Sequence, residues 1–244
     1  MVYVKKIAIF VEGHTELAFV EKILLEIGNT DQLSIRKEEL LGGGKSPLIV
    51  RLIGEKPTTS ETEYHILLRS SCNDEKVLAD IKEHYDKLMQ EGFEKVIGIR
   101  DIYRKDRDNY PRKNSIRSAI NQYIEQNHMQ NAKMILAVME IETWFIAERT
   151  HFSKIHSDLT PQAISAIVDL DKIVDFELEI QHPADTLNQI YHLVGFAYHK
   201  EKKQVQRTIQ ALDYAELYLE VRKKLPNLDD FASQIDDFFD FGQS

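Results

Sequence analysis

The sequence predicts an α/β fold with a doubly wound, mostly parallel sheet and a helical C-terminal region. Short apolar runs alternate with helical patterns as far as about residue 148, which is typical of parallel sheets. From Thr160 onward the pattern is mostly helical. We therefore expect an α/β domain over residues 1–150 and a helical region over residues 151–244 that packs on it.

The composition excludes several classes of protein. The chain has 244 residues, 43% of them apolar, and no apolar run reaches the length of a membrane span. Its single cysteine, Cys72, excludes an intramolecular disulfide and a cysteine-based zinc site. His151 and His156 lack companions at metal-ligand spacing. The N-terminus leads into a strand without a signal peptide, so we expect a cytoplasmic protein that does not bind membranes.

The charge is unevenly distributed along the chain. The formal net charge of -9 argues against broad, non-specific binding of nucleic acid, which needs a positive surface. Basic residues nevertheless gather between Arg100 and Arg117. Within that stretch, Arg104, Lys105 and Arg107 are the candidate phosphate contacts.

The first strand and helix enclose an acidic turn. Residues 6–11 read as a buried strand and residues 17–25 as a helix, with Gly13 in the turn and Thr15 as the expected N-cap. Glu16 falls in the first helical turn, where an acid complements the helix dipole. Glu12 ends the strand, and the dipole does not explain a carboxylate there. In open α/β sheets this edge binds ligands.

The middle of the chain continues the alternation of strands and helices. We expect a glycine loop at residues 42–44 and a helix over Pro47–Ile53. The other expected strands are 33–36, 64–69, 95–101 and 132–140, and the other expected helices are 76–90, 115–127 and 141–148.

Three buried strands thus lead into carboxylates, namely Glu12, Asp101 and Glu140. The ends of parallel strands meet at one sheet edge, and carboxylates gathered there repel each other unless a cation binds. Several hard oxygen ligands suit Mg²⁺ or Mn²⁺. The residues therefore predict a divalent-metal site.

Several stretches resemble a known family. The segment Val11–Glu16 (VEGHTE) resembles the opening motif of the Toprim fold, the topoisomerase–primase module. Its form is similar to the Glu-Gly-x-Thr-Glu motif of OLD-type nucleases and of a related family of small bacterial Toprim-like proteins. Residues 139–148 are similar to the Glu-x-Glu-x-Trp segment of the small family, and residues 183–187 with 198–200 to its C-terminal pattern.

The resemblance implies Mg²⁺-dependent (or Mn²⁺-dependent) phosphodiester cleavage of DNA or RNA. It implies that Glu12 and Asp101 hold a first metal, and that Glu16, Glu140 and Glu142 hold or orient a second metal or act as a base. It also makes Lys200, with Glu12, a catalytic candidate, because a lysine can neutralise charge at a phosphoryl centre. By resemblance, such proteins work in phage defence beside an ATPase partner protein.

Several alternatives stay open. The family's Asp-x-Asp motif has Tyr103 in its second place here. Unless Asp106 or Asp108 substitutes, this leaves the number of metals open and favours a non-catalytic, Toprim-derived interaction subunit. A phosphatase acting on a small molecule is a third candidate. Lys200, with Lys202 and Lys203, also fits a solvated run of charge. The sequence does not decide whether the nucleic acid is DNA or RNA, nor whether the protein forms a homo-oligomer.

Overall fold

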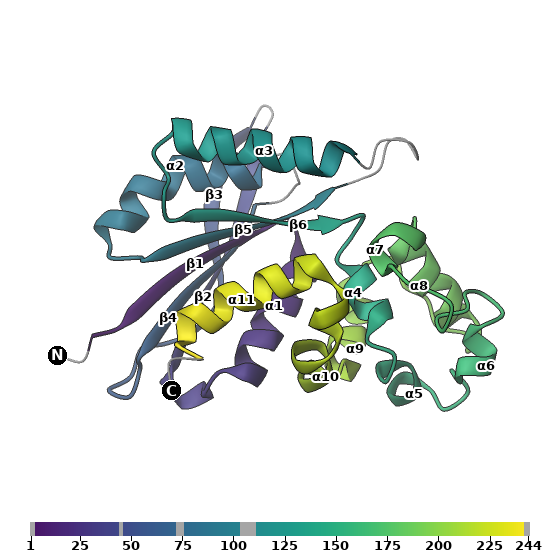
Figure 1. Ribbon diagram of the computed structural model, residues 1–244. Coiled ribbons are helices and arrows are strands. Elements are labelled where there is room, and N and C mark those ends of the chain that lie inside the picture. The colour runs from purple at the N-terminus through teal and green to yellow at the C-terminus, as the bar shows by residue number, and fades with distance from the viewer. Residues whose placement is uncertain (1–2, 44–45, 72–75, 103–110, 242–244) are drawn as a thin grey trace. The chain divides into compact units, whose positions relative to one another are not determined.

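The computed structural model describes residues 3–43, 46–71, 76–102 and 111–241 (Figure 1). Within these ranges six strands form one sheet in the order β3-β2-β4-β1-β5-β6. β1 pairs in parallel with β4 and β5, β2 pairs in parallel with β4, and β3 pairs antiparallel with β2. The predicted α/β class with a mostly parallel sheet is therefore confirmed. The strands are β1 (Lys5–Val11), β2 (Leu33–Gly43), β3 (Ser46–Lys56), β4 (Tyr64–Ser70), β5 (Lys95–Ile102) and β6 (Ala132–Val138).

The chain divides into two compact units. Unit 1 consists of Met1–Arg100, Asp108–Leu136 and Ser233–Ser244, and unit 2 consists of Asp101–Arg107 and Ala137–Ala232. The boundary expected near residue 150 falls inside unit 2. Three elements, β5, β6 and the last helix α11 (Pro226–Phe239), contribute residues to both units.

Helices cover both faces of the sheet in unit 1. Figure 1 shows α2 (Val77–Gln90) and α3 (Pro111–Gln126) on one face, and α1 (His14–Ile27) with the end of α11 on the other. A short 3₁₀ helix, η1 (Thr30–Gln32), follows α1. This arrangement on two faces is compatible with the doubly wound fold that the sequence predicts.

The buried strands explain why the apolar runs were readable from sequence. Ile7, Ala8, Ile9, Phe10 and Val11 of β1 are all fully buried, because both faces of a parallel sheet are covered. In β5, a Cβ at Gly98 would lie only 2.2 Å from the sulfur of Met134. Glycine at this position therefore allows β6 to pack closely.

The expected helix over Pro47–Ile53 is wrong, since these residues belong to strand β3. Five of them are large, apolar and between 39% and 59% exposed, namely Leu48, Ile49, Val50, Leu52 and Ile53. β-Branched residues favour a strand, and pairing with β2 over Ile35–Gly43 provides the hydrogen bonds. β3 is an edge strand, and no described strand pairs with its outer side.

Unit 2 is helical, as the sequence predicts for the chain after Thr160. Its core contains fully or almost fully buried aromatic side chains, among them Trp144, Phe152, Tyr191 and Tyr198. No helix of the described chain is long and apolar enough to cross a membrane. The helices are α4 (Glu142–Ala147), α5 (His151–Ile155), α6 (Pro161–Ile164), α7 (Phe176–Glu179), α8 (Pro183–His192), α9 (Lys202–Ala211), α10 (Tyr214–Leu219), the 3₁₀ helix η2 (Val221–Lys224) and the first half of α11.

Candidate functional site

Glu12 lies at a topological switch point of unit 1. β1 and β4 are adjacent and parallel, and the helices that follow them, α1 and α2, lie on opposite faces of the sheet (Figure 1). The hydroxyl of Ser70 donates to the backbone oxygen of Glu12 at 3.3 Å, and the Ser71 N–H donates to Val11 O at 2.8 Å. The Glu12 residue is 6% exposed. Ligands of open α/β sheets bind in the crevice at such a point.

Glu16 has a structural role at the start of α1. Its Oε2 accepts a hydrogen bond from the Gly13 N–H at 2.9 Å. The helix begins at His14 with Gly13 as N-cap, so the expected cap at Thr15 is wrong. A glutamate at the third helical position reaches back to the N-cap N–H, which explains why the helix starts two residues earlier than expected.

Three of the predicted site residues meet in unit 2, and we call Glu140, Glu142 and Lys200 the acidic cluster. The Lys200 ammonium lies 3.1 Å from Oε1 of Glu140 and 3.2 Å from Oε2 of Glu142. Glu140 follows β6 by two residues, and Glu142 is the first residue of α4. The cluster therefore lies where β6 passes into the helices of unit 2.

Neighbouring groups hold both carboxylates in place. Oε2 of Glu140 accepts from the Ala184 N–H at 2.9 Å, in the first turn of α8, where the helix dipole favours an anion. Oε1 of Glu142 accepts from the Tyr198 hydroxyl at 2.9 Å. Glu142 is fully buried and Tyr198 is 1% exposed, so the hydrogen bond is shielded from water.

The backbone is left-handed at one residue of the acidic cluster and at one residue next to it. Met139, which precedes Glu140, has φ 67°, and Lys200 itself has φ 56°. Left-handed backbone is uncommon for residues other than glycine and costs on the order of 1–3 kcal/mol. Such strain concentrates at functional sites, because only a function or surrounding structure maintains it. His128 and Asp240, which lie outside the cluster, also have positive φ, at 54° and 57°.

The remaining predicted residues are less informative. Asp101 lies within β5, next to its last residue, and is 4% exposed. Arg104, Lys105 and Arg107 lie outside the described residues, as does Tyr103. Among the residues that the structure does describe, no group of three or more histidine, cysteine or acidic side chains is arranged to hold a metal. Carboxylate oxygens are suitable Mg²⁺ ligands, and the acidic cluster brings two carboxylate side chains to the ammonium group of Lys200.

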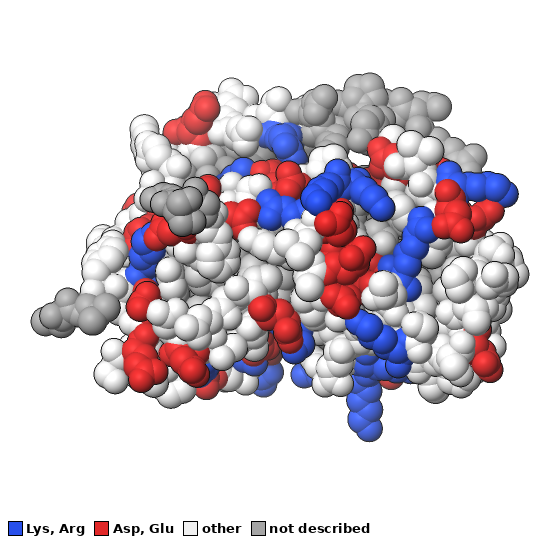
Figure 2. All heavy atoms as spheres, turned by 60° about the horizontal axis from the view of Figure 1, so that its bottom comes forward, with Lys and Arg blue, Asp and Glu red and all other residues white. Residues whose placement is uncertain are grey.

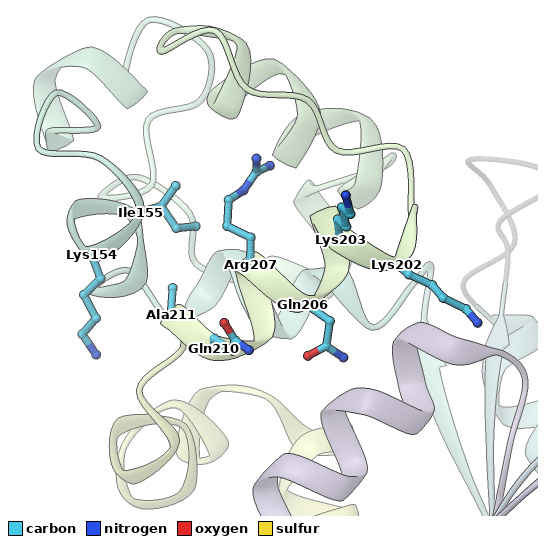
Figure 3. Close-up of a pocket in the computed structure, with 8 residues that line it drawn as sticks. All are labelled: Lys154, Ile155, Lys202, Lys203, Gln206, Arg207, Gln210 and Ala211. Atoms are coloured by element: carbon cyan, nitrogen blue, oxygen red, sulfur yellow. The ribbon is translucent and has the colours of Figure 1, made fainter. Parts of the chain in front are cut away.

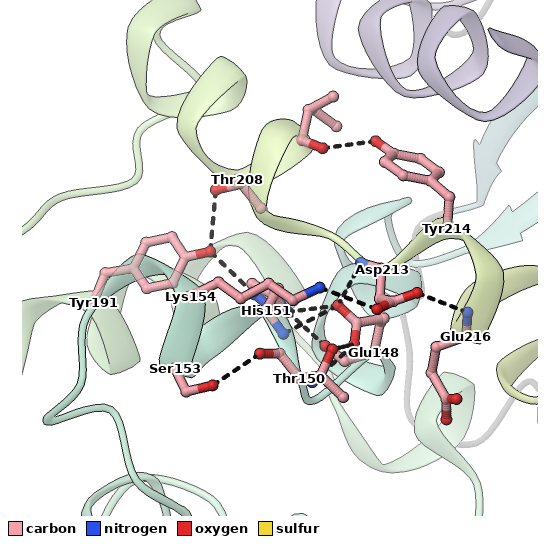
Figure 4. Close-up of polar contacts among 11 residues, drawn as sticks. Glu148, Thr150, His151, Ser153, Lys154, Tyr191, Thr208, Asp213, Tyr214 and Glu216 are labelled. Carbon is pink, nitrogen blue, oxygen red and sulfur yellow. Dashed lines mark hydrogen bonds and ion pairs between the residues drawn. The ribbon is translucent and has the colours of Figure 1, made fainter. Parts of the chain in front are cut away.

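A second polar cluster in unit 2 was missed by sequence reasoning (Figure 4). His151 and Glu148 are both fully buried. Glu148 accepts from the backbone N–H groups of Thr150 and Asp213, at 2.8 and 3.2 Å. Burial raises the pKa of Glu148, but hydrogen bonds from His151 and Thr150 outweigh it and hold the pKa below its ordinary value. The Glu148-x-x-His151 spacing was the available signal.

The same cluster continues to the adjacent helices. Nε2 of His151 lies 3.2 Å from the Tyr191 hydroxyl, which lies 3.0 Å from Oγ1 of Thr208. Burial raises the pKa of Tyr191. Every polar group named here has a protein partner, and the chain of contacts joins α5, α8 and α9. We interpret the cluster as a structural support of unit 2.

Charge is distributed in local groups on the surface. Figure 2 shows acidic and basic side chains interspersed over one face.

In unit 2, a hollow of about 600 Å³ lies along α5 and α9 (Figure 3). We call it the basic hollow, since Lys154, Lys202, Lys203 and Arg207 line it together with Ile155, Gln206, Gln210 and Ala211.

The fold and the acidic cluster define an α/β protein with a strained, lysine-bridged pair of glutamates. Comparison with protein-family models, with curated protein sequences and with solved structures found no significant match in any of the three.

Proposed function

We propose that this chain is a Toprim-like, Mg²⁺-dependent phosphodiesterase that cleaves nucleic acid. The observation that carries the proposal is the acidic cluster, in which Lys200 bridges Glu140 and Glu142 and in which Lys200 itself and the neighbouring Met139 have left-handed backbone. A structural ion pair alone does not require strained backbone at Met139 and Lys200. The proposal also agrees with the segment Val11–Glu16, which resembles the opening motif of Toprim proteins.

The chemistry assigns each side chain a distinct part. Glu140 and Glu142 would hold Mg²⁺, which polarises a phosphate and lowers the pKa of a bound water. The Lys200 ammonium would neutralise charge that develops on the phosphate oxygens. The Tyr198 hydroxyl and the Ala184 N–H orient the two carboxylates. Glu12, Glu16 and Asp101 stay predicted ligands, each of which needs its own variant.

A cleavage assay tests the proposal directly. Purified protein is incubated with supercoiled plasmid and with labelled DNA and RNA strands, in Mg²⁺, Mn²⁺ or EDTA. We expect metal-dependent cleavage that Glu140→Gln, Glu142→Gln and Lys200→Met each reduce at least 100-fold, since each removes charge from the reacting centre. Glu220→Gln, which changes an exposed acid of unit 2 paired with Lys223, is the matched control and should cleave normally.

The unit 1 residues are tested by the same assay. Glu12→Gln should abolish cleavage if Glu12 is a ligand, and Mg²⁺ should then raise the melting temperature of the wild type more than that of the variant. Glu16→Gln also weakens the hydrogen bond from the Gly13 N–H that caps α1, so the melting temperature of this variant must be compared without metal. A wild-type rate in the Glu140→Gln/Glu142→Gln double variant would contradict the proposal.

One observation favours a second candidate, a non-catalytic interaction subunit. Lys200 already pairs with both carboxylates of the acidic cluster and offsets half of their negative charge, and no larger ligand group occurs among the described residues. In that case no substrate is cleaved with any metal, and Lys200→Met lowers stability without a catalytic effect. The proposed ATPase partner would then be sought by co-purification, in which the Glu140→Gln protein should still bind.

A further inference from the structure

The basic hollow of unit 2 contrasts with the rest of an acidic chain. Four of its eight lining residues are cationic, two are glutamines and none is acidic, whereas the chain carries a formal net charge of -9. Figure 3 shows Lys154 and Lys202 at opposite ends of the hollow. A concave surface of one sign concentrates the field and attracts ligands of the opposite sign.

Two lysines of the basic hollow lie where their positive charge disfavours the helix to which they belong. Lys202 and Lys203 are the first two residues of α9, where the positive end of the helix dipole disfavours a cation. The first turn contains no acidic residue, and the side chain of Glu201 makes no capping hydrogen bond. Within the described chain neither lysine has an acidic partner. An anion in the hollow would relieve this unfavourable arrangement.

The third cation of α9 is held in a fixed position. The Arg207 guanidinium stacks over the ring of Phe196, 4.6 Å from its centroid, and lies 5.2 Å from that of Tyr191. Its Nη2 donates to the Ala197 carbonyl oxygen at 2.6 Å. A preorganised guanidinium loses little entropy when it binds a phosphate. Lys154 differs from Arg207, because it forms an ion pair with Asp213 at 3.1 Å that offsets part of its charge.

The length of the hollow fits a polymer better than a single anion. Lys202 and Gln210 are eight residues apart on α9, so a rise of about 1.5 Å per residue separates them by about 12 Å. That distance corresponds to about three nucleotides at the 3.4 Å rise of one strand. Gln206 and Gln210 supply amide donors along the same path. No aromatic side chain lines the hollow, so it offers no platform for stacking bases.

We propose that the basic hollow binds the phosphate backbone of nucleic acid without regard to sequence. The inference rests on the proposed function, because it names the surface that would hold the substrate of that reaction. It goes beyond the acidic cluster, since none of the hollow's lining residues belongs to that cluster.

Binding is measured by fluorescence anisotropy with a labelled 20-nucleotide strand and a 20-base-pair duplex, in EDTA so that cleavage does not interfere. The test variant is Lys202→Gln/Lys203→Gln. The control is Lys223→Gln/Lys224→Gln, which removes the same two charges from another exposed lysine pair of unit 2. We expect the dissociation constant of the test variant to rise at least fivefold and that of the control less than twofold.

The salt dependence provides a second readout. Each lost phosphate contact lowers the slope of log K against log salt by about 0.7 to 0.9, so the test variant should lose about 1 to 2. A random and a fixed sequence should bind alike. Equal effects of the two variants, an unchanged slope, or displacement of the strand by inorganic phosphate at matched ionic strength and equal phosphate concentration would each overturn the inference.

The two proposals fail in different ways. A wild-type protein that binds in EDTA through Lys202 and Lys203 but never cleaves overturns the nuclease function and leaves the hollow as a binding site. A protein that cleaves while the test variant binds normally overturns the hollow alone. The substituted lysines are exposed, so neither variant should melt more than about 2 °C below the wild type.

Discussion

Arg69 donates two hydrogen bonds to one oxygen of Glu38, from Nε at 3.0 Å and from Nη2 at 2.6 Å, and both side chains are 7% exposed. Nη1 of Arg69 also donates to Asp80 at 3.3 Å. The arginine thus joins β2, β4 and α2 in unit 1. A buried charge pair of this kind contributes little when intact, but its disruption leaves charges uncompensated.

We therefore expect Arg69→Met to lower the free energy of unfolding by about 3 kcal/mol. Arg36→Met is the control, because Arg36 pairs with the same carboxylate but is 45% exposed, and it should cost less than about 1 kcal/mol. Urea denaturation of the three proteins measures both values. Equal losses in the two variants would show that burial does not decide the cost.

A pH dependence follows from His84 and Asp80, which lie 3.0 Å apart. The hydrogen bond to Asp80 raises the pKa of His84 above its ordinary 6.5, despite its partial burial. Protonated His84 therefore stabilises the fold below pH 6.5, and this contribution disappears as the pH rises through the raised value. We expect unfolding free energy to decline above pH 6.5 in the wild type and less steeply in His84→Gln. Urea titrations from pH 6 to 8 measure the two slopes, and parallel curves would contradict the assignment.

The end of α3 offers a stabilising change. His128 is exposed and has φ 54°, and the N–H groups of His128 and Met129 donate to Glu125 and Ile124, as in a Schellman cap. Glycine adopts this conformation without strain, so His128→Gly should stabilise the protein by about 1 kcal/mol. Gln126→Gly, two residues earlier and helical, should destabilise it by about 0.5–1 kcal/mol. Thermal melts decide, and the same sign in both variants would refute the prediction.

The exposed edge strand predicts aggregation on heating. Ile49 in β3 is 59% exposed on a sheet edge that no described strand covers. Ile49→Lys should reduce light scattering during heating while it changes stability by less than about 1 kcal/mol. Val174→Lys adds the same charge at an isolated residue that is 90% exposed, and it should leave the scattering unchanged. Scattering that falls equally in both variants would point to net charge instead.

Local patterns predicted the parts of the fold that local forces decide. The strands from Tyr64, Lys95 and Ala132 were readable because a strand covered on both faces is continuously apolar. The strand over 46–56 was not readable, since Pro47 with leucine and isoleucine also suits the start of a helix, and pairing with β2 decides the outcome. Propensity is a weak guide where strand pairing decides the outcome, even when, as for β2 and β3, the paired strands follow each other in sequence.

The candidate site was predictable to a similar degree. The strand-end pattern selected Glu140 and the resemblance selected Lys200, but their contact spans 60 residues and has no local signal. The strained backbone at Met139 could not be foreseen, because methionine does not favour that conformation. The network of Glu38, Arg69 and Asp80 also has no local signal, because its members lie on three separate elements.

The division of α11 between the units has a consequence for how the chain is made. Residues from Ser233 onward belong to unit 1, where Phe238 and Phe239 pack on Tyr64 and Asp240 pairs with Lys5 at 2.5 Å. A ribosome delivers these residues only after all of unit 2 has been translated. The first hundred residues must therefore wait with an unfinished apolar surface around Tyr64, while unit 2 can already fold. Nascent chains stalled before Phe238 should consequently be the species that chaperones hold longest.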